Sequence, residues 1–161
     1  MKNKILKGAL IGCIAILIFA CNGNQSKMDS AAVDKEQIKK EIQAKEDAFA
    51  ELYNKNELKN IGYYAEDAVS YLQNRPPLVG KQEIIDFLMS DVHENTNKII
   101  FQTKEVFPSS DGNQVVEIGY FKVVDSANTP INTGNYMTLF EKRDGRYVSV
   151  RDMSASDRPV E

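Results

Sequence analysis

The apolar residues of this chain follow two different periods along its length. From about residue 35 to residue 92 they recur mainly at helical spacing, and after Asn97 they alternate as in strands. The pattern predicts three helices, at 35–55, 57–68 and 81–92, and a short strand at 68–72. It also predicts four longer strands, at 98–108, 113–125, 131–142 and 146–154. Helices followed by an antiparallel meander indicate an α+β fold, in which a curved sheet wraps the long helix.

The first twenty residues have the pattern of an export signal. "MKNKILK" carries three lysines and no acid, and the apolar run behind it is too short to span a membrane. "LIFAC" resembles the lipobox of bacterial lipoproteins, which implies cleavage before Cys21 and acylation of its thiol; a plain cleaved signal is the alternative. We therefore predict a signal peptide at 1–20, a flexible tether at 21–33 and one domain at 34–158. The domain would be exported to the cell envelope and anchored to a membrane through Cys21.

Charge and cysteine content exclude several function classes. The formal charge is −3, and it becomes −6 when the three lysines of the signal leave. Without a basic stripe to replace the counterions of phosphates, a nucleic-acid partner is not expected. Cys13 would leave with the signal and Cys21 would be lipidated, so we expect the mature domain to have no thiol. With a single histidine besides, no metal site and no cofactor are predicted.

Two stretches of the domain, "YYAEDAVSYLQNRPPLVGKQEIIDFL" and "GNYMTLFEKRDGRYVSVRDM", resemble the NTF2-like superfamily. Within it, the chain is similar to the SnoaL-like and DUF4440-type domains related to ketosteroid isomerase, over about residues 35–157. The resemblance implies a cone of three N-terminal helices on a curved, mostly antiparallel sheet, with an apolar pocket inside. It also implies a homodimer through the outer sheet face. The superfamily includes isomerases, dehydratases, cyclases and association domains, so the resemblance leaves the activity open.

The isomerase pattern needs a carboxylate base, a tyrosine and a protonated aspartic acid. On this sequence the base falls at or next to Leu72, the tyrosine on Ala48 or Phe49, and the acid on Tyr136. Only Tyr136 could donate a hydrogen bond. The resemblance therefore does not favour isomerase activity by that mechanism.

The C-terminal hairpin decides where the carboxylate of Asp152 lies, because a slip of one residue moves every side chain to the other face. A two-residue turn at Asp144 and Gly145 would place Asp152 opposite Met137. A three-residue loop with a bulge would place it opposite Tyr136, on the concave face. The three-residue loop is the favoured register, because it avoids two opposed arginines. Tyr136 would then donate to Asp152, in a structural or a ligand-binding pair.

The main hypothesis is an anchored domain that binds a small apolar or polyketide-like molecule in its cone. The predicted lining residues are Phe49, Tyr53, Tyr64, Phe87, Tyr120, Tyr136, Thr138 and Asp152. One alternative is an association module that dimerises through an outer face formed by Met137, Leu139, Tyr147 and Met153, with Glu117 facing solvent or the partner. A dehydratase- or cyclase-type enzyme that uses Asp152, with Tyr136 as a weaker candidate, is the other.

Overall fold

A computed structural model describes residues 33–94 and 97–158. The predicted signal peptide, Cys21 and all of the tether except Val33 lie outside the described residues. No helix among the described residues is long and apolar enough to cross a membrane.

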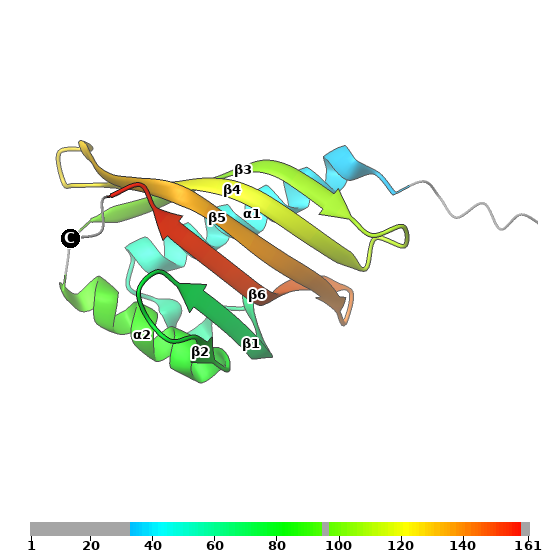
Figure 1. Cartoon of the computed structure of the whole chain (residues 1–161), viewed down its shortest axis with the longest axis horizontal. Coiled ribbons are helices and arrows are strands. Elements are labelled where there is room, and N and C mark those ends of the chain that lie inside the picture. The colour runs from blue at the N-terminus through cyan, green and yellow to red at the C-terminus, as the bar shows by residue number, and fades with distance from the viewer. Residues whose placement is uncertain (1–32, 95–96, 159–161) are drawn as a thin grey trace, which may run out of the picture.

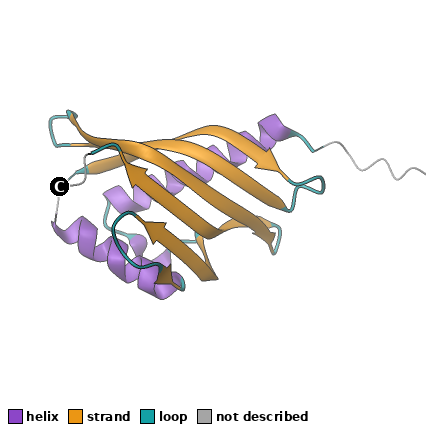
Figure 2. Ribbon diagram, in the orientation of Figure 1, coloured by secondary structure: helices purple, strands orange, loops and turns teal. Residues whose placement is uncertain are grey.

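A curved sheet of six strands wraps the long helix α1 (Figures 1 and 2). The helical elements are α1 (Lys35–Asn54), the 3₁₀ turn η1 (Leu58–Asn60) and α2 (Lys81–Glu94). The strands are β1 (Tyr64–Leu72), β2 (Leu78–Val79), β3 (Lys98–Pro108), β4 (Gln114–Val124), β5 (Pro130–Arg143) and β6 (Arg146–Ser156). Their order is β2-β1-β6-β5-β4-β3, and every neighbouring pair is antiparallel except β1 and β6. The α+β class, the long helix and the four-strand meander are confirmed.

The helix predicted at 57–68 is wrong, because the described chain has two α-helices and only a 3₁₀ turn in this region. The backbone is extended from Ile61, and Tyr64 already pairs with Ser149 of β6. The Ser149 amide donates to the Tyr63 carbonyl at 2.8 Å. Pairing with a distant strand therefore outweighs the helical spacing of Leu58, Ile61 and Tyr64.

Helix α1 begins and is oriented as its sequence predicts. The Asp34 side chain accepts a hydrogen bond from the Gln37 amide at 3.0 Å, which caps the first turn. One face then enters the concavity of the sheet, where its buried residues are Ile38, Ile42, Glu46, Phe49, Ala50 and Tyr53. The spacing of three and four residues places all of them on one stripe. A single charged residue, Glu46, belongs to this buried stripe.

The β5–β6 hairpin has the turn that the sequence analysis did not favour. Asp144 and Gly145 both have positive φ, 51° and 76°, so they form a two-residue type I′ turn with Arg143 opposite Arg146. A β-bulge at Val150 then shifts the register, so that Thr138 pairs with Asp152 and Tyr136 with Ser154. The predicted Tyr136–Asp152 pairing is therefore wrong. Because the bulge inserts one residue, Asp152 nevertheless lies on the concave face.

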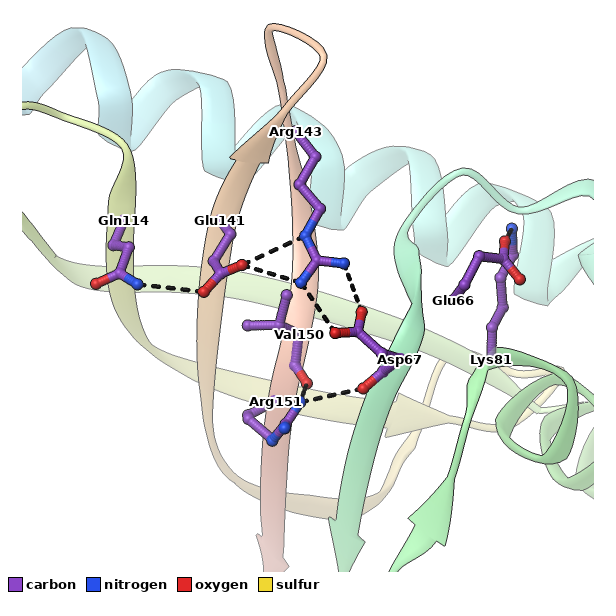
Figure 3. Close-up of polar contacts among 8 residues, drawn as sticks. All are labelled: Glu66, Asp67, Lys81, Gln114, Glu141, Arg143, Val150 and Arg151. Atoms are coloured by element: carbon purple, nitrogen blue, oxygen red, sulfur yellow. Dashed lines mark hydrogen bonds and ion pairs between the residues drawn. The ribbon is translucent and has the colours of Figure 1, made fainter.

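An ion-pair cluster outside the cavity joins β1 to the end of β5 (Figure 3). Arg143 lies 2.5 Å from Asp67 of β1 and 3.0 Å from Glu141 of its own strand. Arg151 of β6, the strand between them, donates to the backbone carbonyl of Asp67 at 3.2 Å. The cluster thus spans the parallel β1–β6 seam, where the ladder is irregular between Tyr64 and Val69.

Two glycines in the sheet leave room for aromatic rings. A Cβ at Gly119 would overlap the ring and hydroxyl of Tyr136, and a Cβ at Gly134 would overlap the ring of Phe121 and the carbonyl of Ala155. Both rings therefore lie close against the concave surface. Tyr147, which was predicted on the outer face, is instead buried, and its hydroxyl donates to the Gly112 carbonyl at 2.5 Å.

Candidate functional site

The cone encloses a cavity of about 220 Å³ between α1, α2 and the concave face of the sheet. Of its nineteen lining residues eight are aromatic and two are acids, Glu46 and Asp152. None of the nineteen is basic. The volume is below the range of about 300–1,000 Å³ that is usual for drug-sized ligands. The cavity therefore suits a small molecule with largely apolar surface.

The structure brings seven of the eight predicted lining residues to this cavity. These are Phe49, Tyr53, Tyr64, Phe87, Tyr136, Thr138 and Asp152. Phe49 lies at the centre of the aromatic wall, with its ring centroid 4.9 Å from that of Tyr63 and 5.5 Å from that of Phe101. Such tilted and edge-to-face contacts hold the rings in fixed orientations.

Tyr120 does not line the cavity. The inward residues of β4 are Val115, Glu117, Gly119 and Phe121, so Tyr120 belongs to the opposite face. It lies beside a separate surface groove, where the Lys104 ammonium is 5.8 Å from its ring centroid. The expectation that Glu117 faces solvent or a partner is wrong for the same reason, since the parity of β4 was assigned in reverse.

Asp152 is held at the cavity wall with one of its two oxygens paired. The Tyr64 hydroxyl donates to Oδ2 at 3.2 Å. The other oxygen, Oδ1, is buried and accepts no hydrogen bond from any described residue. Burial raises the pKa of this carboxyl above its ordinary value, and the nearby hydroxyls of Ser70 and Tyr64 offset part of the rise. A ligand that offers a donor to the Asp152 carboxylate at the cavity wall would stabilise its charge.

A second acidic group lies deeper, where Glu46 of α1 meets Glu117 of β4. Their side chains are 1 % and 0 % exposed. Glu46 accepts from the Tyr63 hydroxyl at 2.5 Å. Glu117 Oε1 accepts from Thr103 at 2.6 Å and from Tyr136 at 2.9 Å. The Tyr136 hydroxyl therefore donates to Glu117 and not to Asp152, because Tyr136 pairs with Ser154 across the hairpin.

The two carboxyl groups of this pair hold one proton between them. Glu117 Oε2 is buried without an amide or hydroxyl donor among the described residues, and the Glu46 carboxyl lies near enough to raise or lower the pKa of its neighbour as a hydrogen-bond partner would. A carboxyl donates only when protonated. Burial and the charge of Glu117 raise the pKa of Glu46 well above its ordinary value, whereas hydroxyl donors moderate the rise at Glu117. Glu46 is thus the protonated member and donates to the Glu117 carboxylate.

Neither Glu46 nor Glu117 was predicted from the sequence as a buried acid, and only Glu46 lies in a sequence pattern that could have revealed it. Glu46 lies four residues after Ile42 and three before Phe49, on the apolar stripe of the helix. A charge at such a position indicates a buried acid. Glu117 left no comparable signal, because both faces of β4 carry apolar residues. No group of three or more metal-ligating side chains is found in the described part of the chain.

A curved sheet around a long helix, with an aromatic cavity inside, is the architecture of the NTF2-like fold, and the chain has this fold. A ketosteroid isomerase-like protein from Erwinia carotovora atroseptica matches with a TM-score of 0.60 at 21% identity, over 75% of this chain and 97% of its own. An NTF2-like protein from Novosphingobium aromaticivorans matches with a TM-score of 0.66 at 11% identity, over 78% and 85%. A putative calcium/calmodulin-dependent protein kinase II association domain from Xanthomonas campestris matches with a TM-score of 0.57 at 16% identity, over 77% of this chain and 88% of its own. No protein-family model and no curated protein matches the sequence.

The proton shared by Glu46 and Glu117 makes stability depend on pH. Because its folded pKa is raised, Glu46 keeps a proton that the unfolded chain releases above about pH 4.5. The free energy of unfolding should therefore fall as pH rises from there toward the folded pKa, by up to about 1.4 kcal/mol per pH unit. Glu46→Gln supplies a permanent donor to Glu117 and keeps an acceptor for Tyr63. It should flatten this slope, as measured by urea unfolding between about pH 5 and pH 9.

Glu36→Gln is the matched control, because Glu36 is exposed on the same helix. It should leave the slope unchanged. If Glu46→Gln retains the slope of the original chain, the shared proton is not present.

Proposed function

We propose that the domain binds a small, mainly apolar molecule in the cavity of its cone. The observation that carries this proposal is the carboxyl group of Asp152, which lines an aromatic cavity and forms no ion pair with a described residue. A ligand donor at this carboxylate supplies orientation, and the surrounding rings supply apolar contact. The NTF2-like fold is compatible with such a pocket, since a ketosteroid isomerase-like protein has a similar structure.

Binding without isomerisation is favoured over the chemistry of the ketosteroid isomerases. Leu72 and Phe49, at the positions that the resemblance assigns to the base and the tyrosine, both line the cavity. Neither side chain can exchange a proton at these positions. The acids of this cavity lie instead on α1 and β6, in a different arrangement.

The ligand site can be tested by filling the cavity. Ser154 of β6 lines it, whereas its neighbour Ala155 is exposed on the outer face. Benzyl alcohol, as a neutral probe, should raise the melting temperature of the full-length protein; at one hundred times its dissociation constant the gain is about 2.7 kcal/mol. Ser154→Phe should abolish this gain, and Ala155→Phe should preserve it. Equal stabilisation of both variants would place the probe outside the cone.

We further propose that Cys21 is acylated and holds the domain at the envelope membrane. The support is the "LIFAC" stretch with the polar segment behind it. Cys21→Ser should move the protein from the membrane fraction to the soluble fraction, as followed by immunoblotting of fractionated cells. Unchanged membrane association of this variant would contradict the proposal.

A second candidate function is homodimerisation through the outer face of the sheet. Tyr71, Met153 and Met137 lie in register across β1, β6 and β5, and are 44%, 53% and 41% exposed. An apolar row of this kind favours a protein contact. Of the predicted outer-face residues, Leu139 is half-buried and Tyr147 is not part of the row.

Sedimentation equilibrium at micromolar concentration should show a dimer that Met153→Asp converts to a monomer. Ile100→Asp is the control, since Ile100 is also an exposed apolar residue but lies on β3 at the other edge of the sheet. A monomeric original chain would refute the dimer.

A further inference from the structure

The wall of the cavity has the chemistry of a cation site. Eight of its nineteen lining residues present aromatic rings, and none is a lysine, an arginine or a histidine. The faces of aromatic rings carry partial negative charge and attract cations, most strongly where water is excluded. Phe87 already makes such a contact, since the Arg75 guanidinium lies 3.9 Å from its ring centroid. Arg75 is exposed and is not among the residues that line the cavity.

The acids around the cavity lack a positive counterpart. Asp152 receives a hydrogen bond from the neutral Tyr64 hydroxyl, and the Ser70 hydroxyl near it is also neutral. The Glu46–Glu117 pair holds one proton and therefore one negative charge, which the Thr103 and Tyr136 hydroxyls stabilise at Glu117. No described ion pair includes any of these three acids. Bringing a monovalent cation to Asp152 would give a neutral pair at a site of low dielectric constant.

We propose that the occupant of the cavity is a small organic cation, a protonated amine of about one-ring size, whose N–H donates to the Asp152 carboxylate while its carbon skeleton packs on the aromatic wall. This inference rests on the proposed function, since it names the ligand class of the same cavity. It differs from the simple form of that function, in which a neutral alcohol would donate to Asp152 equally well.

Benzylamine and benzyl alcohol form a matched pair of probes, because both have one ring and a hydrogen-bond donor and only the amine is charged near neutral pH. In calorimetric titrations of the full-length protein at pH 7, benzylamine should bind roughly tenfold or more tightly than benzyl alcohol. Asp152→Asn should weaken the binding of benzylamine by a similar factor and change the affinity for benzyl alcohol by no more than about twofold. Asp144→Asn, which removes the same charge from the exposed hairpin turn, should change neither affinity.

The pH dependence of the affinity for benzylamine distinguishes a ligand-binding Asp152 from one that only stabilises the fold. The titratable groups that face Asp152 are Tyr64 of β1 and Glu46 of α1. Burial raises the pKa of both groups, which favours the phenol form of Tyr64 and the protonated form of Glu46. Lowering the pH should therefore weaken the binding of benzylamine as Asp152 becomes protonated. Because its pKa is raised, this should happen at a higher pH than for an ordinary aspartate. Benzyl alcohol should bind with little change.

The outcomes separate the two proposals. If benzylamine and benzyl alcohol bind within about twofold of each other, or if Asp152→Asn weakens both equally, the cation inference is overturned while binding in the cone stands. If Ser154→Phe leaves the binding of benzyl alcohol intact, the cone itself is not the site. Binding of neither probe overturns both proposals.

Discussion

The contact between two buried acids, Glu46 and Glu117, joins the long helix to β4 at a point where neither side chain is exposed to water. A hydrogen bond between them needs at least one proton on the pair. Two ionised carboxylates in contact would repel each other, and two protonated ones would lose the charge that Thr103 and Tyr136 stabilise. Glu46 lies on the same stripe of α1 as the buried apolar residues. This stripe brings Phe49 and Tyr53 to the cavity and Ile38 and Ile42 to the core.

Much of the fold followed from periodicity, because the change from helical to alternating spacing is strong in this chain. The long helix, the meander and the concave position of Asp152 were all predicted. The second helix was not correct, since Tyr63 and Tyr64 are held in extended conformation by β6, which lies far away in sequence. Local spacing carries no information about such a partner.

The candidate site was predictable only in part, for reasons that lie in the sheet. The bulge at Val150 leaves no sequence mark, because Ser149, Val150 and Arg151 are all acceptable in a regular strand. Asp152 therefore lies on the predicted face because of the bulge, and not because of a three-residue loop. The hydroxyl that donates to it belongs to Tyr64 and not to Tyr136. The parity of β4 was equally hidden, since Val116 and Ile118 look as suitable for a core as Val115 does. Both errors concern which side of a strand faces inward, and both were decided by contacts between strands.

The parallel seam between β1 and β6 also determines when the cavity can form. Tyr64 and Asp152 are 88 residues apart in the chain, and their strands are the first and last of the long strands. Closing so long a loop costs entropy before any contact repays it, so we expect this pairing to form late in folding. The cavity wall therefore depends on a strand at the far end of the domain sequence. A change that weakens β6 should disturb the cavity as well as the sheet, because Asp152 and Ser154 both line it.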